Sequence, residues 1–295
     1  MMIDPILSGG ISTSSYLPIV RNNSTSNTQV AKSLSRLSSG LRIQTAADAP
    51  ADLSESERLR SIISRYESAI SNSDNAVSYL STADSYLQNI SNTLGRMQEL
   101  AISANDGTKT DTDRAALQTE FGQLQESITS TTSGTSPLAS FNGSPIFQGN
   151  VKTTAIGPDA GQETQLVSMD LTATSTQAVG NDSQGNPIQW GSIVSSDATG
   201  ISIASQSAAG TTIEKLGAAI DYLSSTRAQI GAQYSSINAN TEGLRNAQMN
   251  SISRESSIRD LDYAKETVNL VKFMNLGQIN RGILSKTMGK LLATA

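Results

Sequence analysis

Residues 59–104 read LRSIISRYESAISNSDNAVSYLSTADSYLQNISNTLGRMQELAISA, and this stretch decides the fold. Apolar or small residues recur in it three and four positions apart, which is the spacing of a coiled-coil helix. One step of three followed by another of three, at Val77, Leu80 and Ala83, interrupts the heptads locally. The pattern predicts one long helix over about 53–104, because Asn-Asp-Gly at 105–107 then ends it.

A second seam with the same spacing appears late in the chain, between Ile213 and Leu244. Two seams at opposite ends of a sequence can leave water by packing against each other or against other copies. The residues expected to form this coiled-coil seam are Leu59, Ile63, Leu80, Leu87 and Leu94 on the N-terminal side, and Leu223, Ile230 and Ile237 on the C-terminal side.

A shorter helix is expected directly after the long one. Thr110 and Asp113 have the spacing of a capping box, and apolar residues from Leu117 to Ile128 mark a helix antiparallel to the first. Between about 129 and 210 the helical period is lost. Runs at 164–172 and 191–194, separated by Gly, Asn, Asp and Pro, predict strands and hairpins, with Trp190 as an apolar anchor.

The two ends of the chain are expected to depend on partners. Residues 1–27 are polar and interrupted by Pro and Gly, so we expect them to be extended or disordered in the free chain. A short helix begins at Val30 and breaks at Gly40, and the last stretch contains glycines at 277, 282 and 289 that disfavour a helix. The residues expected to need subunit assembly for their burial are Val30, Leu34, Leu37, Leu41, Val268, Val271, Ile279 and Ile283.

Composition favours an elongated assembly over a thick globular core. Of 295 residues, 37% are hydrophobic and 4% aromatic, and narrow seams need fewer apolar side chains than a core does. The chain has no Cys and no His, which excludes thiol nucleophiles, imidazole catalysis and the usual zinc sites. Asp260 and Asp262 lack a cleft or a metal-ligand pattern. We therefore expect no enzyme, no cofactor and no metal.

Charge and hydropathy restrict the partners further. The net charge is -5, from 21 basic and 26 acidic residues, without a basic stripe carrying aromatic residues, so no nucleic acid is expected. No apolar run reaches the roughly 18 residues of a membrane span, and no membrane partner is expected. Residues 1–16 do not look like a secretory signal peptide.

Several motifs, in order, resemble bacterial flagellin. They cover about the first 145 and the last 85 residues, and the middle matches no known pattern. The motifs are LSRLSSGLRI at 34–43, Ala46 to Asp48, SESERLRS at 54–61, RMQELAISAN at 96–105, FNG at 141–143 and SIRDLDYAKETVN at 257–269. The first 27 residues and the last eight, MGKLLATA, depart from the family's usual pattern.

The resemblance implies a subunit that polymerises into the flagellar filament for swimming motility. The fold expected is mainly α, an elongated coiled-coil bundle of the N- and C-terminal segments with a small β-containing centre. The implied segments are an inner-tube segment at 1–45, coiled-coil helices at 46–145, an outward central segment at 146–210, a coiled-coil helix at 211–253 and an inner-tube helix at 254–295.

The resemblance also implies partners and a location. The partners are other copies in an open helical homopolymer, hook-filament junction and cap proteins, an export chaperone at the C-terminal segment, and the type III export apparatus. The location is extracellular, with a periplasmic flagellum as the alternative. Residues matching Arg96, Leu100 and Glu120 form an innate-receptor surface in the family.

Two other functions stay open at this point. A hook-filament junction protein would share the terminal helices but would not propagate a filament, and a secreted adhesin or effector with a coiled-coil stalk would be a stable monomer. The mixed charges from Arg254 to Lys265 are either a solvated face or intersubunit ion pairs. The Ser and Thr residues of the middle are either turn formers or O-glycosylation sites.

Overall fold

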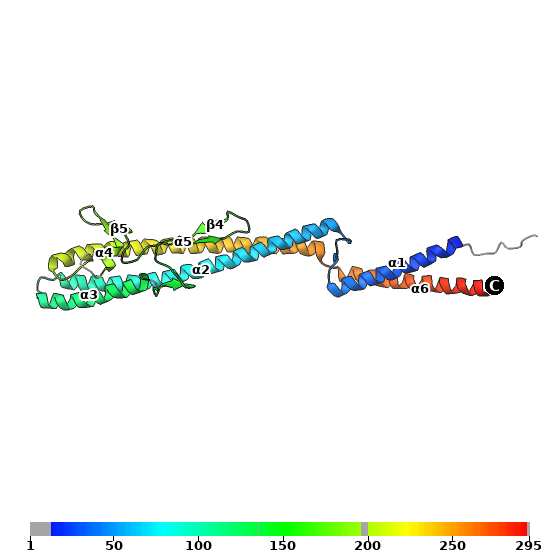
Figure 1. The fold of residues 1–295 in the computed structure, drawn as a ribbon, viewed down its shortest axis with the longest axis horizontal. Helices are drawn as coiled ribbons and strands as arrows, with labels where there is room; N and C mark the ends of the chain where they lie inside the picture. Colours follow the sequence, from blue (N-terminus) through cyan, green and yellow to red (C-terminus); the bar gives the residue numbers. More distant parts are fainter. Residues whose placement is uncertain (1–12, 135, 196–199, 294–295) are drawn as a thin grey trace, which may run out of the picture. The chain divides into compact units, whose positions relative to one another are not determined.

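The computed structural model describes residues 13–134, 136–195 and 200–293. In these ranges the chain is mainly α-helical and carries three small antiparallel pairs of strands, as the sequence predicts (Figure 1). The helices are α1 (Thr13–Ser39), α2 (Pro50–Ala104), α3 (Asp111–Thr132), α4 (Trp190–Val194), α5 (Gln206–Arg259) and α6 (Tyr263–Ala293). The strands are β1 (Ser140–Phe141), β2 (Ser144–Pro145), β3 (Thr153–Ala155), β4 (Glu163–Gln165), β5 (Ala178–Asn181) and β6 (Pro187–Gln189), paired in chain order.

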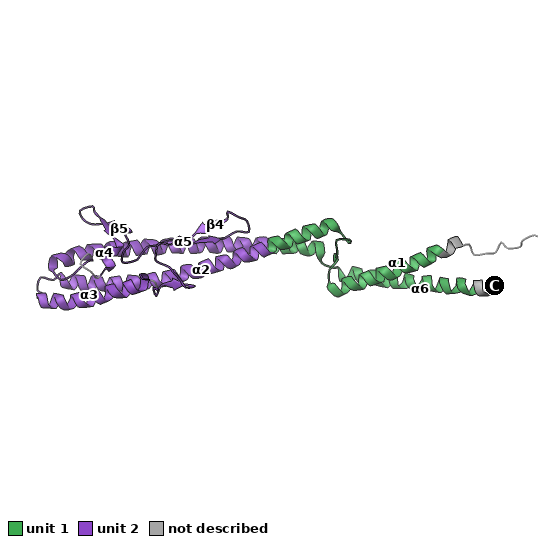
Figure 2. Cartoon of the chain, in the orientation of Figure 1, with its two compact units in different colours: residues 1–63, 249–295 green, residues 64–248 purple. Residues whose placement is uncertain are grey.

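The chain divides into two compact units (Figure 2). Unit 1 contains residues 1–63 and 249–295, and unit 2 contains residues 64–248. Helices α2 and α5 each contribute residues to both units, whereas α1 and α6 belong to unit 1 and α3, α4 and the strands to unit 2. Residues far apart in the sequence therefore make up each unit.

The predicted long helix is confirmed as α2, which begins at Pro50. Proline suits the first turn of a helix because its missing N–H would have no helical partner there. In unit 2, α2 and α5 are antiparallel, since Asp84 pairs with Arg227 at 2.7 Å and Asp74 with Arg245 at 3.7 Å. The seam residues of this unit are at most 3% exposed: Leu80, Leu87, Leu94, Leu223, Ile230 and Ile237. The local 3-3 step moves the seam, and Ala76 and Tyr79 are buried while Val77 is half-buried.

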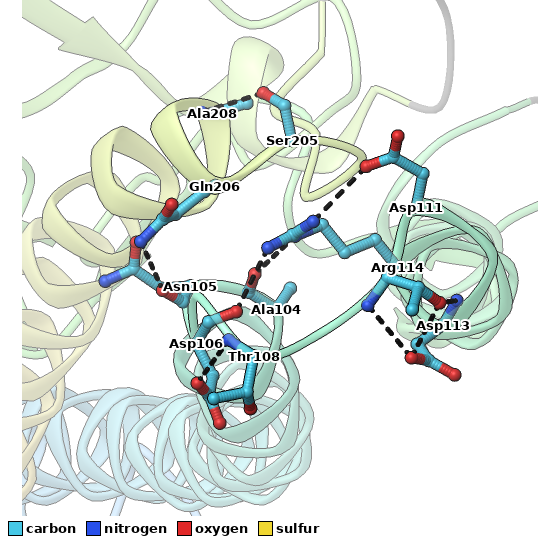
Figure 3. Close-up of polar contacts among 11 residues, drawn as sticks. Ala104, Asn105, Asp106, Thr108, Asp111, Asp113, Arg114, Ser205, Gln206 and Ala208 are labelled. Carbon is cyan, nitrogen blue, oxygen red and sulfur yellow. Dashed lines mark hydrogen bonds and ion pairs between the residues drawn. The ribbon is translucent and has the colours of Figure 1, made fainter.

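Helix α3 begins with the predicted capping box, in which Thr110 and Asp113 exchange hydrogen bonds. The carbonyl groups at the end of α2 are satisfied from α3 by Arg114, which is 7% exposed (Figure 3). Arg114 Nε donates to the Ala104 carbonyl at 3.0 Å, and Nη2 donates to the Asp106 carbonyl at 3.0 Å. Gln206, at the start of α5, donates to the Asn105 carbonyl at 3.1 Å. This arginine thus fixes the turn between α2 and α3.

The central segment packs on α3 and α5 through one apolar cluster. Trp190 is fully buried, and its Nε1 donates to the Leu171 carbonyl at 2.7 Å. The buried amide of Gln125, on α3, donates to the carbonyls of Ile193, Ser195 and Ile201 at 3.0–3.3 Å. The centre is therefore attached to the helices by apolar burial and by hydrogen bonds, those of Gln125 and also those of Gln118, Gln233 and Asn240.

The expected strand at 191–194 is wrong, because this run is helix α4. Trp190, Ile193 and Val194 are all completely buried. A helical turn places residues i, i+3 and i+4 on one side, whereas a strand would turn Ile193 and Val194 to opposite faces. The expected strand at 164–172 survives only as β4.

Candidate assembly surfaces

Helices α1 and α6 form an antiparallel pair within unit 1. A Cβ atom placed on Gly277 would lie 3.9 Å from the Ser26 Cβ, and one placed on Gly40 would lie 2.8 Å from the Tyr263 hydroxyl. The start of α6 therefore lies beside the end of α1. Residues 13–27, expected to be extended or disordered in the free chain, belong to a helix in the structure, where they pack against α6 despite the low helix propensity of Ser and Asn. Residues 1–12 lie outside the described part.

The seam inside this pair is unusually polar. Ser26, Ser33 and Glu266 are 6%, 2% and 7% exposed, and Gly277 is also buried. The neighbouring Asn23 carries a buried Oδ1 without a hydrogen-bond partner among the described residues. Polar and small residues at seam positions lower the stability of a helix pair compared with aliphatic ones. The fully buried positions of the α1–α6 contact are therefore mostly polar or small, whereas its larger apolar side chains are half-buried at most.

The large apolar side chains of the pair face outward instead. Of the eight residues that the sequence assigns to subunit assembly, Leu34, Val268, Val271, Ile279 and Ile283 are 53%, 68%, 51%, 57% and 43% exposed. The other three, Val30, Leu37 and Leu41, are half-buried. Further exposed apolar side chains are Leu17, Val20, Met274, Leu276 and Met288. So many exposed large apolar side chains on one helix pair favour a protein–protein interface.

Two connectors join the terminal pair to the long helices, and they bind each other. Residues 40–49 follow α1 and residues 260–262 precede α6. Leu41 and Asp260 form an antiparallel bridge, in which the Arg42 amide donates to the Arg259 carbonyl at 2.8 Å. The Arg42 guanidinium also donates to the Ile258 carbonyl, at the end of α5. Gly40 starts this connector with φ +73°, a left-handed conformation that favours glycine.

Asp48 organises the first connector. Its carboxylate accepts hydrogen bonds from the Thr45 amide and hydroxyl at 3.2 and 3.1 Å, and it pairs with Arg36 at 3.4 Å. Burial alone raises the pKa of Asp48, but the bonds from Thr45 and Gln44 and the charge of Arg36 outweigh it and lower the pKa. The carboxylate thus stays ionised and holds the loop.

The ends of α2 and α5 in unit 1 carry an ion-pair cluster. Arg259, with a side chain 16% exposed, lies 3.1 Å from Glu57 and 3.9 Å from Glu255, and the fully buried Ser56 hydroxyl donates to Glu255. The charged run at 254–265 is therefore partly structural within one chain. Of the seam residues expected in unit 1, Leu59 is buried and Ile63 half-buried.

The three residues of the implied receptor surface do not share one accessible face. Arg96 donates to Glu120 at 2.8 and 3.1 Å and to Glu99 at 2.9 Å, and these bonds, with Glu120 first, raise the pKa of Arg96. Leu100, however, is only 4% exposed because it packs in the apolar cluster of unit 2. The expectation that Leu100 lies on the surface is wrong for this chain.

Throughout 13–134, 136–195 and 200–293, no cluster of three or more His, Cys, Asp or Glu side chains could hold a metal ion. In the same ranges, no helix combines the length and apolar character of a membrane span. The surfaces that stand out are the outward faces of α1 and α6.

Comparison with known proteins gives two family matches. Residues 11–152 match the bacterial flagellin N-terminal helical region, and residues 213–288 match the bacterial flagellin C-terminal helical region. The residues between the two matches, 153–212, hold most of the strands. The matches contain α1, α2 and α3 whole, α5 from residue 213 onward and α6 up to residue 288.

Individual relatives cover nearly the whole chain. A protein named flagellin from Halalkalibacterium halodurans is 31% identical over 90% of this chain and 90% of its own length. A flagellar filament 30.7 kDa core protein from Treponema maltophilum is 30% identical over 88% of this chain and 89% of its own. A solved putative flagellar hook-associated protein from Vibrio parahaemolyticus, 14% identical, shares the fold with TM-score 0.57 over 72% of this chain and 100% of its own.

Proposed function

Because this chain belongs to the bacterial flagellin family and is a structural subunit of the flagellar filament, we propose that the outward faces of α1 and α6 make its subunit contacts. The observation that carries the proposal is the exposure of five predicted assembly residues, from 43% at Ile283 to 68% at Val268. Burying them between copies would offset part of the entropy lost on assembly, at about 25 cal/mol per Å² of apolar area.

Residues 1–45 and 254–295 then form the inner tube of the filament, and 146–210 face outward. The contacts between copies are heterologous and do not close, which is how identical subunits make an open fibre. The chain acts mechanically and not as an enzyme. We place the filament outside the cell, with the periplasm as the alternative location.

The polar seam between α1 and α6 supports a second part of the proposal. A pair held by Ser26, Ser33 and Gly277 gains little from its own contact, so it orders fully only when other copies cover its outer face. Backbone amides of α1 and α6 should exchange with deuterium rapidly in the dispersed chain and slowly in filaments. Strong protection in the dispersed chain would contradict this part alone.

Assembly can be tested with a matched pair of variants. Val268→Ser/Ile279→Ser/Ile283→Ser should prevent the purified chain from forming long filaments in electron micrographs after salt-induced polymerisation. Val151→Ser, which changes an apolar side chain 60% exposed in the central segment, should assemble normally. Normal filaments from the triple variant would exclude this surface. Failure of the unchanged chain to propagate would favour a junction protein.

The remaining partners belong to the same proposal. The C-terminal segment binds an export chaperone before type III export, and the filament ends contact junction and cap proteins. Pull-down of the chaperone by the full chain but not by a chain lacking residues 254–295 would support the chaperone site.

For the receptor surface, we propose that Arg96 and Glu120 contact the receptor directly and that Leu100 contributes only through packing. Equal reporter-cell responses to Arg96→Ala and to the unchanged chain would contradict this proposal.

A further inference from the structure

Positive charge is concentrated in the terminal helix pair. Residues 13–39 and 263–293 contain eight Lys and Arg against one acidic residue, a net charge of +7. The rest of the chain contains 13 basic and 25 acidic residues, a net charge of -12. The single acidic residue of the pair, Glu266, is 7% exposed in the seam and accepts from Asn269 at 3.3 Å. The outer surface of the pair is therefore basic.

Helix α6 carries two stripes of side chains on different faces. One stripe packs against α1 and contains Glu266, Leu270, Phe273, Gly277 and Leu284, which are buried or half-buried. The other stripe is centred about a third of a turn away at steps of three or four residues. Its members are exposed: Lys265, Val268, Lys272, Leu276, Ile279, Ile283 and Lys286. We call this second set the outer stripe. It combines aliphatic side chains in the middle with lysines toward both ends.

The lysines of the outer stripe have unsatisfied charge. None of Lys265, Lys272 and Lys286 forms an ion pair with a residue that the structure describes; Lys272 only lies 6.0 Å from the centre of the Phe273 ring. In unit 2, by contrast, several acidic groups are paired with arginines, as Asp84 is with Arg227 and Glu120 with Arg96. A second copy of α1 or α6 would bring only the buried Glu266 as a counter-charge. The outer stripe therefore fits an anionic surface that the terminal helices themselves do not offer.

We propose that α6 of the dispersed chain becomes fully ordered on an anionic lipid surface, which its outer stripe binds. The aliphatic side chains reach the boundary of the acyl region, and the long lysine side chains place their ammonium groups at the phosphates. The acidic remainder of the chain is repelled by the same surface, which leaves only the terminal helices in contact. Such binding needs no membrane span, so the sequence argument against a membrane partner does not apply to it.

Co-sedimentation with vesicles tests the proposal on the full, dispersed chain. Vesicles of phosphatidylcholine mixed with phosphatidylglycerol should bind the chain, and vesicles of phosphatidylcholine alone should not. At about 1 kcal/mol for each lysine near an anionic surface, Lys265→Gln/Lys272→Gln/Lys286→Gln should weaken partitioning by about 100-fold. The control Lys109→Gln/Lys152→Gln/Lys215→Gln removes the same charge from unit 2 and should bind like the unchanged chain.

Salt gives a second readout on the unchanged chain. Raising the ionic strength shortens the Debye length, so less of the chain should sediment with the anionic vesicles. Equal binding to both vesicle types, or an equal loss in the two triple variants, would overturn the proposal. Sedimentation without vesicles would assign the stripe to a second copy and would overturn it as well. Filament formation by the unchanged chain is measured separately, so absence of lipid binding would leave the proposed assembly intact.

Discussion

Replacing Arg114, which is buried, with Met should destabilise unit 2. The substitution keeps an unbranched apolar stem but removes the donors to the carbonyls of Ala104 and Asp106, both at 3.0 Å. Hydrogen bonds from a charged group contribute about 1.5–3 kcal/mol each, or about 3–6 for two. The pair with Asp111, whose side chain is 99% exposed, adds nothing measurable.

Water can reach part of this turn, since Asp106 is exposed, whereas Ala104 is completely buried. We therefore expect a loss near the lower limit, about 3 kcal/mol, which corresponds to a fall in Tm of about 6–12 °C for a domain of 150–250 residues. Trp190 is the only tryptophan and is buried in unit 2, so its fluorescence during thermal or urea unfolding reports this unit.

Two controls separate the hydrogen bonds from the charge. Lys109→Met removes a neighbouring positive charge without a carbonyl contact and should change stability by less than about 0.5 kcal/mol. Arg114→Lys keeps the charge but lacks the planar fork that reaches two carbonyls, and it should lose most of the same free energy. A loss below about 1 kcal/mol for Arg114→Met, or an equal loss for Lys109→Met, would refute the reasoning.

Three other changes have expected outcomes. In Gly40→Ala the alanine must adopt φ +73°, and its Cβ must displace the Tyr263 hydroxyl. The free energy of unfolding of unit 1, followed by circular dichroism, should therefore fall by about 1–2 kcal/mol. An unchanged free energy would contradict the left-handed conformation of the connector. The folded state lowers the pKa of Asp48 below its ordinary 3.8, so the stabilisation from this carboxylate is fully present above pH 3.8 and is lost as the pH falls through the lowered pKa. The loss should appear as faster hydrogen exchange of the Gln44 and Thr45 amides, which donate to the carboxylate. In Asp48→Asn the same amides should exchange quickly at neutral pH too, and slow exchange there would contradict the role of the carboxylate. Gln125→Leu leaves three carbonyls without this donor and should destabilise the Trp190 environment by about 2–3 kcal/mol. An unchanged urea midpoint would show that the hydrogen bonds of Gln125 contribute nothing measurable to stability.

The helices with a long apolar period could be predicted from the sequence because apolar side chains recur three and four residues apart along their whole length. The heptads of α2, the capping box at Thr110 and the glycine break after α1 are all local patterns, and each is present in the structure. Such patterns combine spacing with the chemistry of a single residue type, so no knowledge of the tertiary fold is needed.

Features that depend on tertiary packing could not be predicted in the same way. Residues 13–29 of α1 lack an apolar period because their seam consists of Asn and Ser, which pack against Gly277 and its neighbours. The run at 191–194 is too short for its period to separate a strand from a helical turn. The predicted boundary between two helices at 253 and 254 is absent, because α5 continues to Arg259. There Arg42, from the connector that follows α1, donates a hydrogen bond to the Ile258 carbonyl near the end of α5.

Among candidate site residues, the sequence identified which positions are apolar but not which way they face. Val30, Leu34, Leu37 and Leu41 have one spacing, yet only Leu34 is exposed, because the pair with α6 covers the others in part. The resemblance to flagellins implies a surface position for Leu100, but the apolar cluster of unit 2 buries it. The positive charge of the terminal pair emerges only when α1 and α6 are taken together.

The central claim is that other copies cover the outward faces of α1 and α6 in the filament, and thiol labelling at Ile279 tests it most directly. The chain has no Cys, so Ile279→Cys and the control Val151→Cys each introduce a single thiol. Both positions should react with a maleimide in the dispersed chain, where their side chains are 57% and 60% exposed. In assembled filaments Cys at 279 should be protected while Cys at 151 still reacts. Equal reactivity of position 279 in filaments and in the dispersed chain would contradict the account.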